Sequence, residues 1–113
     1  MTLLFSLLSL FFININAPST HVGEWEYSVV TPDYTYKGIM TIQEEDGVFS
    51  GLIVSEGTEI ELNDVSIEED QLTFTMNVQG FPCKVIGTFD GDSFTGEVAV
   101  EGMTLPMKAT KVE

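Results

Sequence analysis

Residues 71–100 read QLTFTMNVQGFPCKVIGTFDGDSFTGEVAV. Apolar and polar side chains alternate in three runs, at 72–78, 81–89 and 94–100, and glycine or Asp-Gly-Asp separates one run from the next. A period of two places alternate side chains on opposite faces of a β-strand, and these separating residues are typical of tight turns. This stretch therefore predicts three antiparallel strands joined by short turns.

The same pattern continues through the rest of the chain after residue 20, without any sustained helical period. It predicts eight strands, at about 24–30, 35–44, 48–55, 59–67, 72–78, 81–89, 94–100 and 103–112. Asp46-Gly47 is the strongest hairpin signal, since both residues tolerate positive φ. In the fourth strand the alternation changes phase, which predicts a β-bulge near Asn63-Asp64.

Eight short strands joined in sequence predict an all-β fold, an eight-stranded antiparallel up-and-down barrel. Glycines within the predicted strands fit the sharp bends of a small barrel; they are Gly38, Gly51, Gly87 and Gly96. Pro106 falls within the last strand and lacks an N–H group. It therefore predicts either a bulge or an imperfect seam between the first and last strands. A two-layer β-sandwich is the alternative fold.

The N-terminal stretch differs from the rest of the chain. Residues 3–13 are almost all apolar, and small or polar residues follow to Thr20. This pattern is typical of a secretory signal peptide and is too short to span a bilayer comfortably. We predict a signal peptide and linker at 1–20, a single domain at 21–113, and export to the periplasm or the extracellular space. A buried or membrane-anchoring N-terminal helix is the alternative.

The predicted domain is strongly acidic. The chain has eighteen Asp and Glu, four Lys and no Arg, which gives a net charge of −14. Such a chain repels nucleic-acid backbones and anionic membrane surfaces, because both bind through cationic side chains. The regularly spaced aromatic and β-branched residues argue against disorder.

The residues do not predict catalysis or a metal site. His21, the only histidine, lies in the predicted linker as a free side chain, so it forms no triad with a nucleophile. Cys83 is the only cysteine and is expected to be a small buried hydrophobic residue. One histidine and one cysteine are too few for a closed zinc site, and the acidic runs do not have the spacing of a calcium loop. We expect no enzyme activity, metal or cofactor.

The inner face of the predicted barrel is rich in aromatic and methionine side chains. They are Trp25, Tyr27, Tyr36, Met40, Phe74, Met76, Phe81, Phe94, Met103 and Met107. Such a lining suits an adaptable apolar pocket, but it suits a filled core equally well. A barrel of eight strands is just wide enough for either.

Gly23-Glu24-Trp25, at the start of the first strand, resembles the Gly-x-Trp of the calycins, the superfamily of lipocalins and avidin-like proteins. The resemblance covers about residues 23–112 and implies that Trp25 packs across one end of the barrel. It also implies that a basic residue of the last strand, Lys108 or Lys111, lies over the Trp25 ring. The layout and the Phe-Ser/Thr-Gly hairpins further resemble calycin-like barrel domains of secreted bacterial proteins, particularly from the Bacteroidetes.

Two functions remain open at this point. The first is a module that binds a small apolar ligand inside the barrel. The second is a domain with a filled core that acts on a protein partner through its acidic surface, or as an accessory to an exported system. A cavity within the barrel would favour the first.

Overall fold

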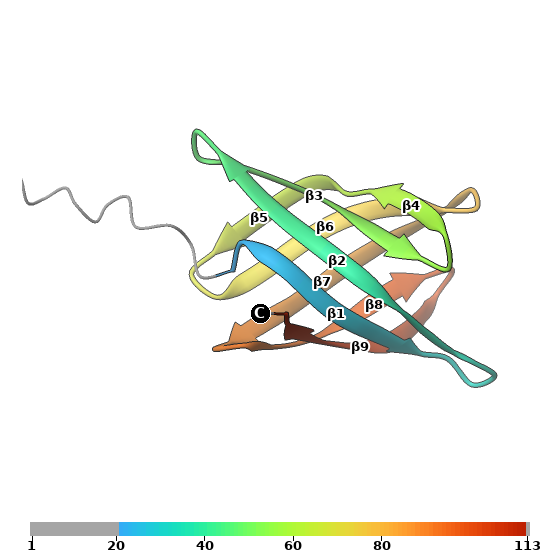
Figure 1. Ribbon diagram of the computed structural model, residues 1–113. Coiled ribbons are helices and arrows are strands. Elements are labelled where there is room, and N and C mark those ends of the chain that lie inside the picture. The colour runs from blue at the N-terminus through green and yellow to red at the C-terminus, as the bar shows by residue number, and fades with distance from the viewer. Residues whose placement is uncertain (1–20, 113) are drawn as a thin grey trace, which may run out of the picture.

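The computed structural model describes residues 21–112, and the regular structure in this range consists of β-strands (Figure 1). The strands are β1 (Gly23–Val30), β2 (Thr35–Glu45), β3 (Val48–Ser55), β4 (Thr58–Glu61), β5 (Asn63–Glu68), β6 (Gln71–Val78), β7 (Phe81–Asp90), β8 (Ser93–Val100) and β9 (Met103–Lys111). Within the described range, no helix is long and apolar enough to cross a membrane. The predicted signal peptide lies outside the described residues.

The nine strands form one antiparallel sheet that curves into a nearly closed up-and-down barrel (Figure 1). Their order is β4-β3-β2-β1-β9-β8-β7-β6-β5, so β1 pairs with β9, and the two edges of the sheet are β4 and β5. Across these edges β5 contacts β3, and β4 contacts β6. One continuous, rolled sheet contradicts the alternative of a two-layer sandwich.

The number of strands is nine, so the prediction of eight is wrong. The fourth predicted strand, 59–67, is divided at Leu62 into β4, which pairs with β3, and β5, which pairs with β6. Leu62 is buried, and its N–H donates to the carbonyl oxygen of Gly51 at 3.0 Å. The predicted bulge is confirmed, because the β5–β6 register shifts between Asn63 and Ser66. The phase change in the sequence is therefore the point where the chain leaves one partner strand for another.

The strands show no bulge at Pro106, so that part of the prediction is wrong, whereas the β1–β9 ladder ends just before this residue, which agrees with the predicted imperfect seam. β1 and β9 pair without a shift as far as Val29 and Met107. The N–H of Val112 donates to the carbonyl oxygen of Glu24 in β1. Every second residue of a strand directs its backbone N–H to the same neighbouring strand, so the nitrogen of Pro106 also faces β1. Pro106 lies just beyond the last β1–β9 pair, where the ladder needs no donor.

Tight turns join most of the hairpins. Four two-residue turns have positive φ at both positions: Asp46-Gly47, Glu56-Gly57, Gln79-Gly80 and Glu101-Gly102. Positive φ at both positions is the geometry of a type I′ turn, whose twist matches that of the flanking strands. The sequence predicted a turn at each of these places.

Alternate side chains of the strands face the barrel interior, as the period of two in the sequence predicted. The buried core comprises Trp25, Tyr27, Met40, Ile42, Ile53, Leu62, Leu72, Phe74, Met76, Cys83, Val85, Phe89, Phe94, Val98, Met107 and Ala109. In β7 the burial alternates strictly from Cys83 to Phe89. Most of the outward-facing positions of the strands are polar or charged.

Two strands approach closely where Gly87 of β7 faces Gly96 of β8. A Cβ atom at Gly87 would lie 2.4 Å from Cζ of Phe94 and 2.7 Å from Cα of Gly96. The Phe94 ring therefore covers both glycines, and their missing side chains leave the room that this ring occupies.

Candidate functional site

The two ends of the barrel differ, and the first is closed by Trp25. This side chain is fully buried and packs against Phe89 with ring centroids 4.9 Å apart. Nζ of Lys111, on β9, lies 5.8 Å from the centroid of the Trp25 ring. Of the two expected lysines, Lys111 is therefore the one over the ring, at a distance that permits a cation–π interaction. Gly23 makes room for it, since a Cβ there would lie 3.1 Å from Cε of Lys111.

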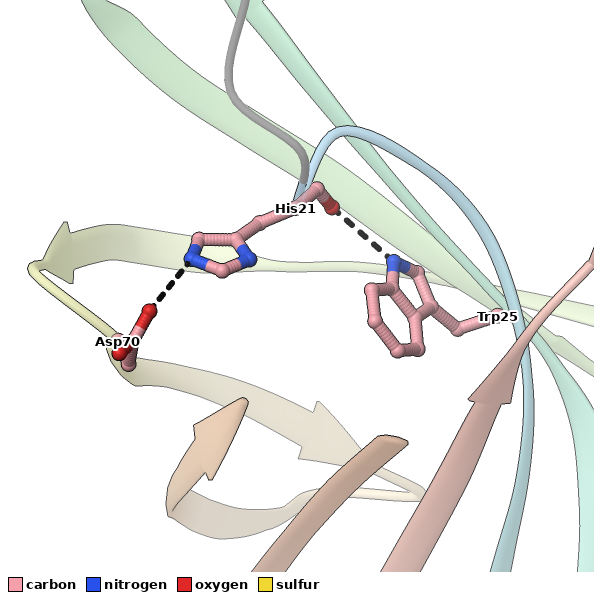
Figure 2. A network of polar contacts seen from close by, with 3 residues as sticks. All are labelled: His21, Trp25 and Asp70. Carbon is pink, nitrogen blue, oxygen red and sulfur yellow. Dashed lines mark hydrogen bonds and ion pairs between the residues drawn. The ribbon is translucent and has the colours of Figure 1, made fainter. Parts of the chain in front are cut away.

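His21 belongs to this closed end, so the prediction of a free linker histidine is wrong (Figure 2). Its carbonyl oxygen accepts a hydrogen bond of 3.0 Å from Nε1 of Trp25. The imidazole stacks on Phe89, with centroids 4.0 Å apart, and its Nε2 lies 3.3 Å from Oδ1 of Asp70. The N–H of Phe89 also donates to the carbonyl oxygen of Asp70. His21 thus packs over the closed end and is joined there to the β5–β6 turn.

The opposite end holds an apolar pocket of about 300 Å³. Inward-facing positions of six strands and parts of two turns line it: Val29, Thr31, Tyr36, Met76, Val78, Gln79, Phe81, Cys83, Val98, Val100, Met103 and Leu105. Ten of these twelve residues are apolar or aromatic. This volume is at the lower end of the range for small-molecule sites.

The ten residues predicted for the barrel interior divide between this pocket and the core. Four line the pocket: Tyr36, Met76, Phe81 and Met103. The other six fill the core: Trp25, Tyr27, Met40, Phe74, Phe94 and Met107. The barrel is therefore filled towards Trp25 and hollow towards the other end.

Sequence reasoning did not single out several residues of the pocket. They are mostly small aliphatic side chains on the same strands: Val29, Val78, Val98, Val100 and Leu105. The alternation already gives them the same facing as their larger neighbours, so the signal was present. Their position along the barrel axis, which alternation does not give, is what brings them to the pocket.

The mouth of the pocket exposes large apolar side chains. Tyr36, Phe81 and Met103 are 47%, 46% and 51% exposed, although they lie on the inner faces of their strands. Tyr34 packs edge-on against Tyr36, with centroids 4.9 Å apart. A cluster of exposed apolar residues around a hollow is typical of a binding surface.

A second hollow of about 470 Å³ adjoins the pocket where β4 lies beside β6. It shares Tyr36, Val78 and Gln79 with the pocket, and its other lining residues are Ser55, Glu56, Thr58, Glu59, Ile60, Glu61, Asn63 and Asn77. Most of these side chains are carboxylates, amides or hydroxyls. The site therefore has an apolar part within the barrel and a polar part at the unpaired edges.

Two further hollows lie away from the barrel interior. A shallow one of about 550 Å³ lies on the outer face over β1, β2 and β9, with Lys37 and Lys108 in its lining. Another, of about 400 Å³, lies beside the end of β2 near Glu44 and Glu45. Charged side chains lie in the lining of both, whereas the pocket has none, so the pocket is the better site for an apolar ligand.

Burial raises the pKa of the Cys83 thiol in the pocket wall. Its Sγ atom lies 3.6 Å from the carbonyl oxygen of Phe81. A raised pKa keeps the thiol protonated and weakly nucleophilic, as expected of a small hydrophobic residue. Burial also raises the pKa of Tyr27, which a hydrogen bond to Ser55 opposes and the charge of Glu56 reinforces.

At the rim, the Tyr34 hydroxyl donates a hydrogen bond of 2.6 Å to a carboxylate oxygen of Glu56. This hydrogen bond is the main cause of the raised pKa of Tyr34. Among residues 21–112, no three His, Cys, Asp or Glu side chains gather in a way that could hold a metal ion.

Comparison with solved structures shows the fold. The chain is similar to a redesigned β-barrel, mFAP1, bound to DFHBI (13% identity, TM-score 0.61, covering 82% of this chain and 95% of that one). It is also similar to fatty-acid-binding protein 1 of Echinococcus granulosus (10%, 0.55, 83% and 98%). Secretory abundant heat soluble protein 4 of Ramazzottius varieornatus is a third (14%, 0.57, 86% and 98%). The protein thus has the fold of the calycin-like, lipocalin-type barrels.

In sequence, no family model matches the chain, and no curated protein matches it. At identities of 10–14% the structural likeness extends to the fold alone. A common fold does not establish a common ligand, so the function must be argued from the site.

Proposed function

We propose that this protein is a non-enzymatic binding protein that holds a small apolar molecule in the open end of its barrel. The observation that carries the proposal is the apolar pocket of about 300 Å³ with exposed apolar residues at its mouth. Of the seven large hydrophobic side chains that are exposed among the described residues, five lie at this end of the barrel: Val30, Tyr34, Tyr36, Phe81 and Met103.

Contact between water and these exposed apolar side chains provides the driving force for ligand binding. An apolar ligand that covers them removes their surface from water, at about 25 cal/mol for each Å². The filled core below the pocket supplies a rigid floor, because close-packed side chains do not collapse into the hollow. Two of the similar structures are of a fatty-acid-binding protein and of a barrel with bound DFHBI, which supports a small molecule as the ligand.

We propose further that the protein performs no catalysis and is exported. The imidazole of His21 is packed at the closed end, and burial raises the pKa of the Cys83 thiol, so neither is placed as an activated group. Export rests on the apolar run near the N-terminus. A bacterial source of the Bacteroidetes type rests only on the sequence resemblance.

The alternative is a domain that acts on a protein partner through its acidic outer face. The filled half of the barrel favours this alternative, because a core needs no ligand to be stable. Native mass spectrometry of the protein from its source separates the two, since a retained small molecule supports ligand binding and a stoichiometric protein partner supports the alternative.

The proposal predicts that the neutral apolar probe N-phenyl-1-naphthylamine binds saturably with a rise in its fluorescence. Phe81→Ala removes one wall of the mouth and is expected to weaken binding by about tenfold, since a tenfold loss corresponds to the transfer of roughly two methylene groups. Phe81 is half exposed, so the variant is expected to fold.

The matched control is Ile86→Ala, which removes a similarly exposed apolar side chain from the opposite face of the same strand. It is expected to bind the probe as the native protein does. Absence of saturable binding to the native protein, or equal binding by Phe81→Ala, would contradict the proposal.

A further inference from the structure

The charges around the pocket bear on the kind of ligand that it accepts. The lining of the hollow that adjoins the pocket includes three glutamates, Glu56, Glu59 and Glu61, all of them exposed to solvent. Glu56 is also held at the rim by the hydrogen bond from Tyr34. A ligand in the pocket that extends its polar end into this hollow would meet these carboxylates.

Positive charge is absent from the lining of both the pocket and the adjoining hollow. The chain has four lysines and no arginine, and each lysine has another place. Lys37 and Lys108 line the hollow on the outer face, Lys84 is exposed on the outer face of β7, and Lys111 lies over Trp25 at the closed end.

A negatively charged ligand would therefore be disfavoured twice. Its charge would lose water without gaining a cationic partner, which makes burial unfavourable. The nearby carboxylates would also repel it, because like charges that lie close together repel one another, and salt screens this repulsion only in part.

Neutral polar groups, in contrast, have partners in the same hollow. Ser55 and Thr58 carry hydroxyls, and Asn63, Asn77 and Gln79 carry amides that both donate and accept hydrogen bonds. A cationic end would be attracted by the carboxylates in addition.

We infer that the ligand of this barrel is an apolar molecule whose polar end is neutral or cationic, and that the site rejects carboxylates such as fatty acids. This inference rests on the proposed function and adds the charge of the ligand to it. This specificity for charge is determined by the carboxylates of Glu56, Glu59 and Glu61.

The experiment measures displacement of N-phenyl-1-naphthylamine by three compounds of eight carbon atoms each: octylamine, octanol and octanoate. Near neutral pH these are a cation, a neutral molecule and an anion. At low salt we expect octanoate to bind more weakly than octylamine by about tenfold or more, with octanol between them. In about 0.5 M NaCl the difference between the two charged compounds is expected to shrink.

Variants assign the effect to the hollow. Replacing Glu56, Glu59 and Glu61 with Gln is expected to strengthen octanoate binding by about fivefold or more, and to change octanol binding by less than about twofold. The control replaces Glu24, Glu44 and Glu45 with Gln, which changes the net charge equally but near the closed end. This control is expected to leave the order of the three compounds unchanged.

The outcomes distinguish this inference from the proposed function. If the native protein binds the neutral probe but binds octanoate as tightly as octylamine, the inference is wrong and the proposed function stands. If the control variant strengthens octanoate binding as much as the triple variant of the hollow, the assignment to these three glutamates is wrong. If the neutral probe does not bind, the proposed function fails and the inference fails with it.

Discussion

At the scale of single residues, Trp25 contributes to the fold through several independent contacts. Its ring is fully buried against Phe89 and below Lys111, and its N–H group donates to the carbonyl oxygen of His21. The hydrogen bond satisfies the one polar group that burial of an indole would otherwise leave without a partner. A single side chain thereby closes the barrel end and holds His21 against it.

We expect Trp25→Ala to lower the free energy of unfolding by about 3–5 kcal/mol, because it leaves a large cavity at the closed end. That loss is a large part of the stability of a small domain. Chemical denaturation followed by circular dichroism measures it, and Trp25→Phe, which keeps a ring, is expected to lose less. Near-native stability of Trp25→Ala would show that the closed end does not support the barrel.

At the scale of elements, hairpins with alternating faces build both the core and the pocket. Alternation of apolar and polar side chains does not fully describe the β7–β8 hairpin, because two of its inward-facing positions are glycines, Gly87 and Gly96. The Phe94 ring occupies the space above them, and the two strands approach closely there. The packing of this hairpin therefore depends on two residues that have no side chain.

Gly87→Ala is expected to destabilise the protein by about 1–3 kcal/mol, the usual effect of overpacking a tight core. The added methyl group would meet the backbone of the next strand as well as the Phe94 ring, so rotation of one side chain cannot relieve it. Thr88→Val, at the exposed neighbouring position, serves as the control and is expected to change stability by less than about 0.5 kcal/mol. Urea unfolding of both variants provides the comparison.

At the scale of the whole molecule, the barrel is closed by hydrogen bonds at β1–β9 and open between β4 and β5. The two edge strands pair on one side only, and they are also the two shortest strands of the sheet. Strands with fewer cross-strand hydrogen bonds open at lower free energy than those paired on both sides.

Hydrogen exchange is therefore expected to be faster in β4 and β5 than in β1 and β9. Native-state exchange read by mass spectrometry or NMR gives the rates for each strand. Slow exchange in β4, with fast exchange in β9, would place the weak seam at β1–β9 and contradict the arrangement described above. Saturation with a bound ligand is expected to slow exchange at the open end more than at the closed end.

The sequence by itself determined the strands, apart from the division of 59–67 into two, together with the turns, the bulge near Asn63-Asp64 and the side of each strand that faces inward. These features are local, since a period of two and positive φ at an Asp-Gly pair are properties of neighbouring residues. It also indicated the Trp25 end, through a short motif at the start of the first strand. The resemblance that this motif carries also implied a lysine over the Trp25 ring, and Lys111 lies there.

Only the tertiary structure decided that the chain changes its partner strand at Leu62, where His21 lies and which inward residues surround a pocket. These features depend on residues far apart in the sequence: His21 meets Phe89, and Val29 and Phe81 line the same pocket. Met107 and Met103 illustrate the point, because both face inward on one strand, yet one is buried and the other is half exposed. Their alternation is the same, and their depth along the barrel differs. Depth is set by the closure of all nine strands, which no local pattern encodes.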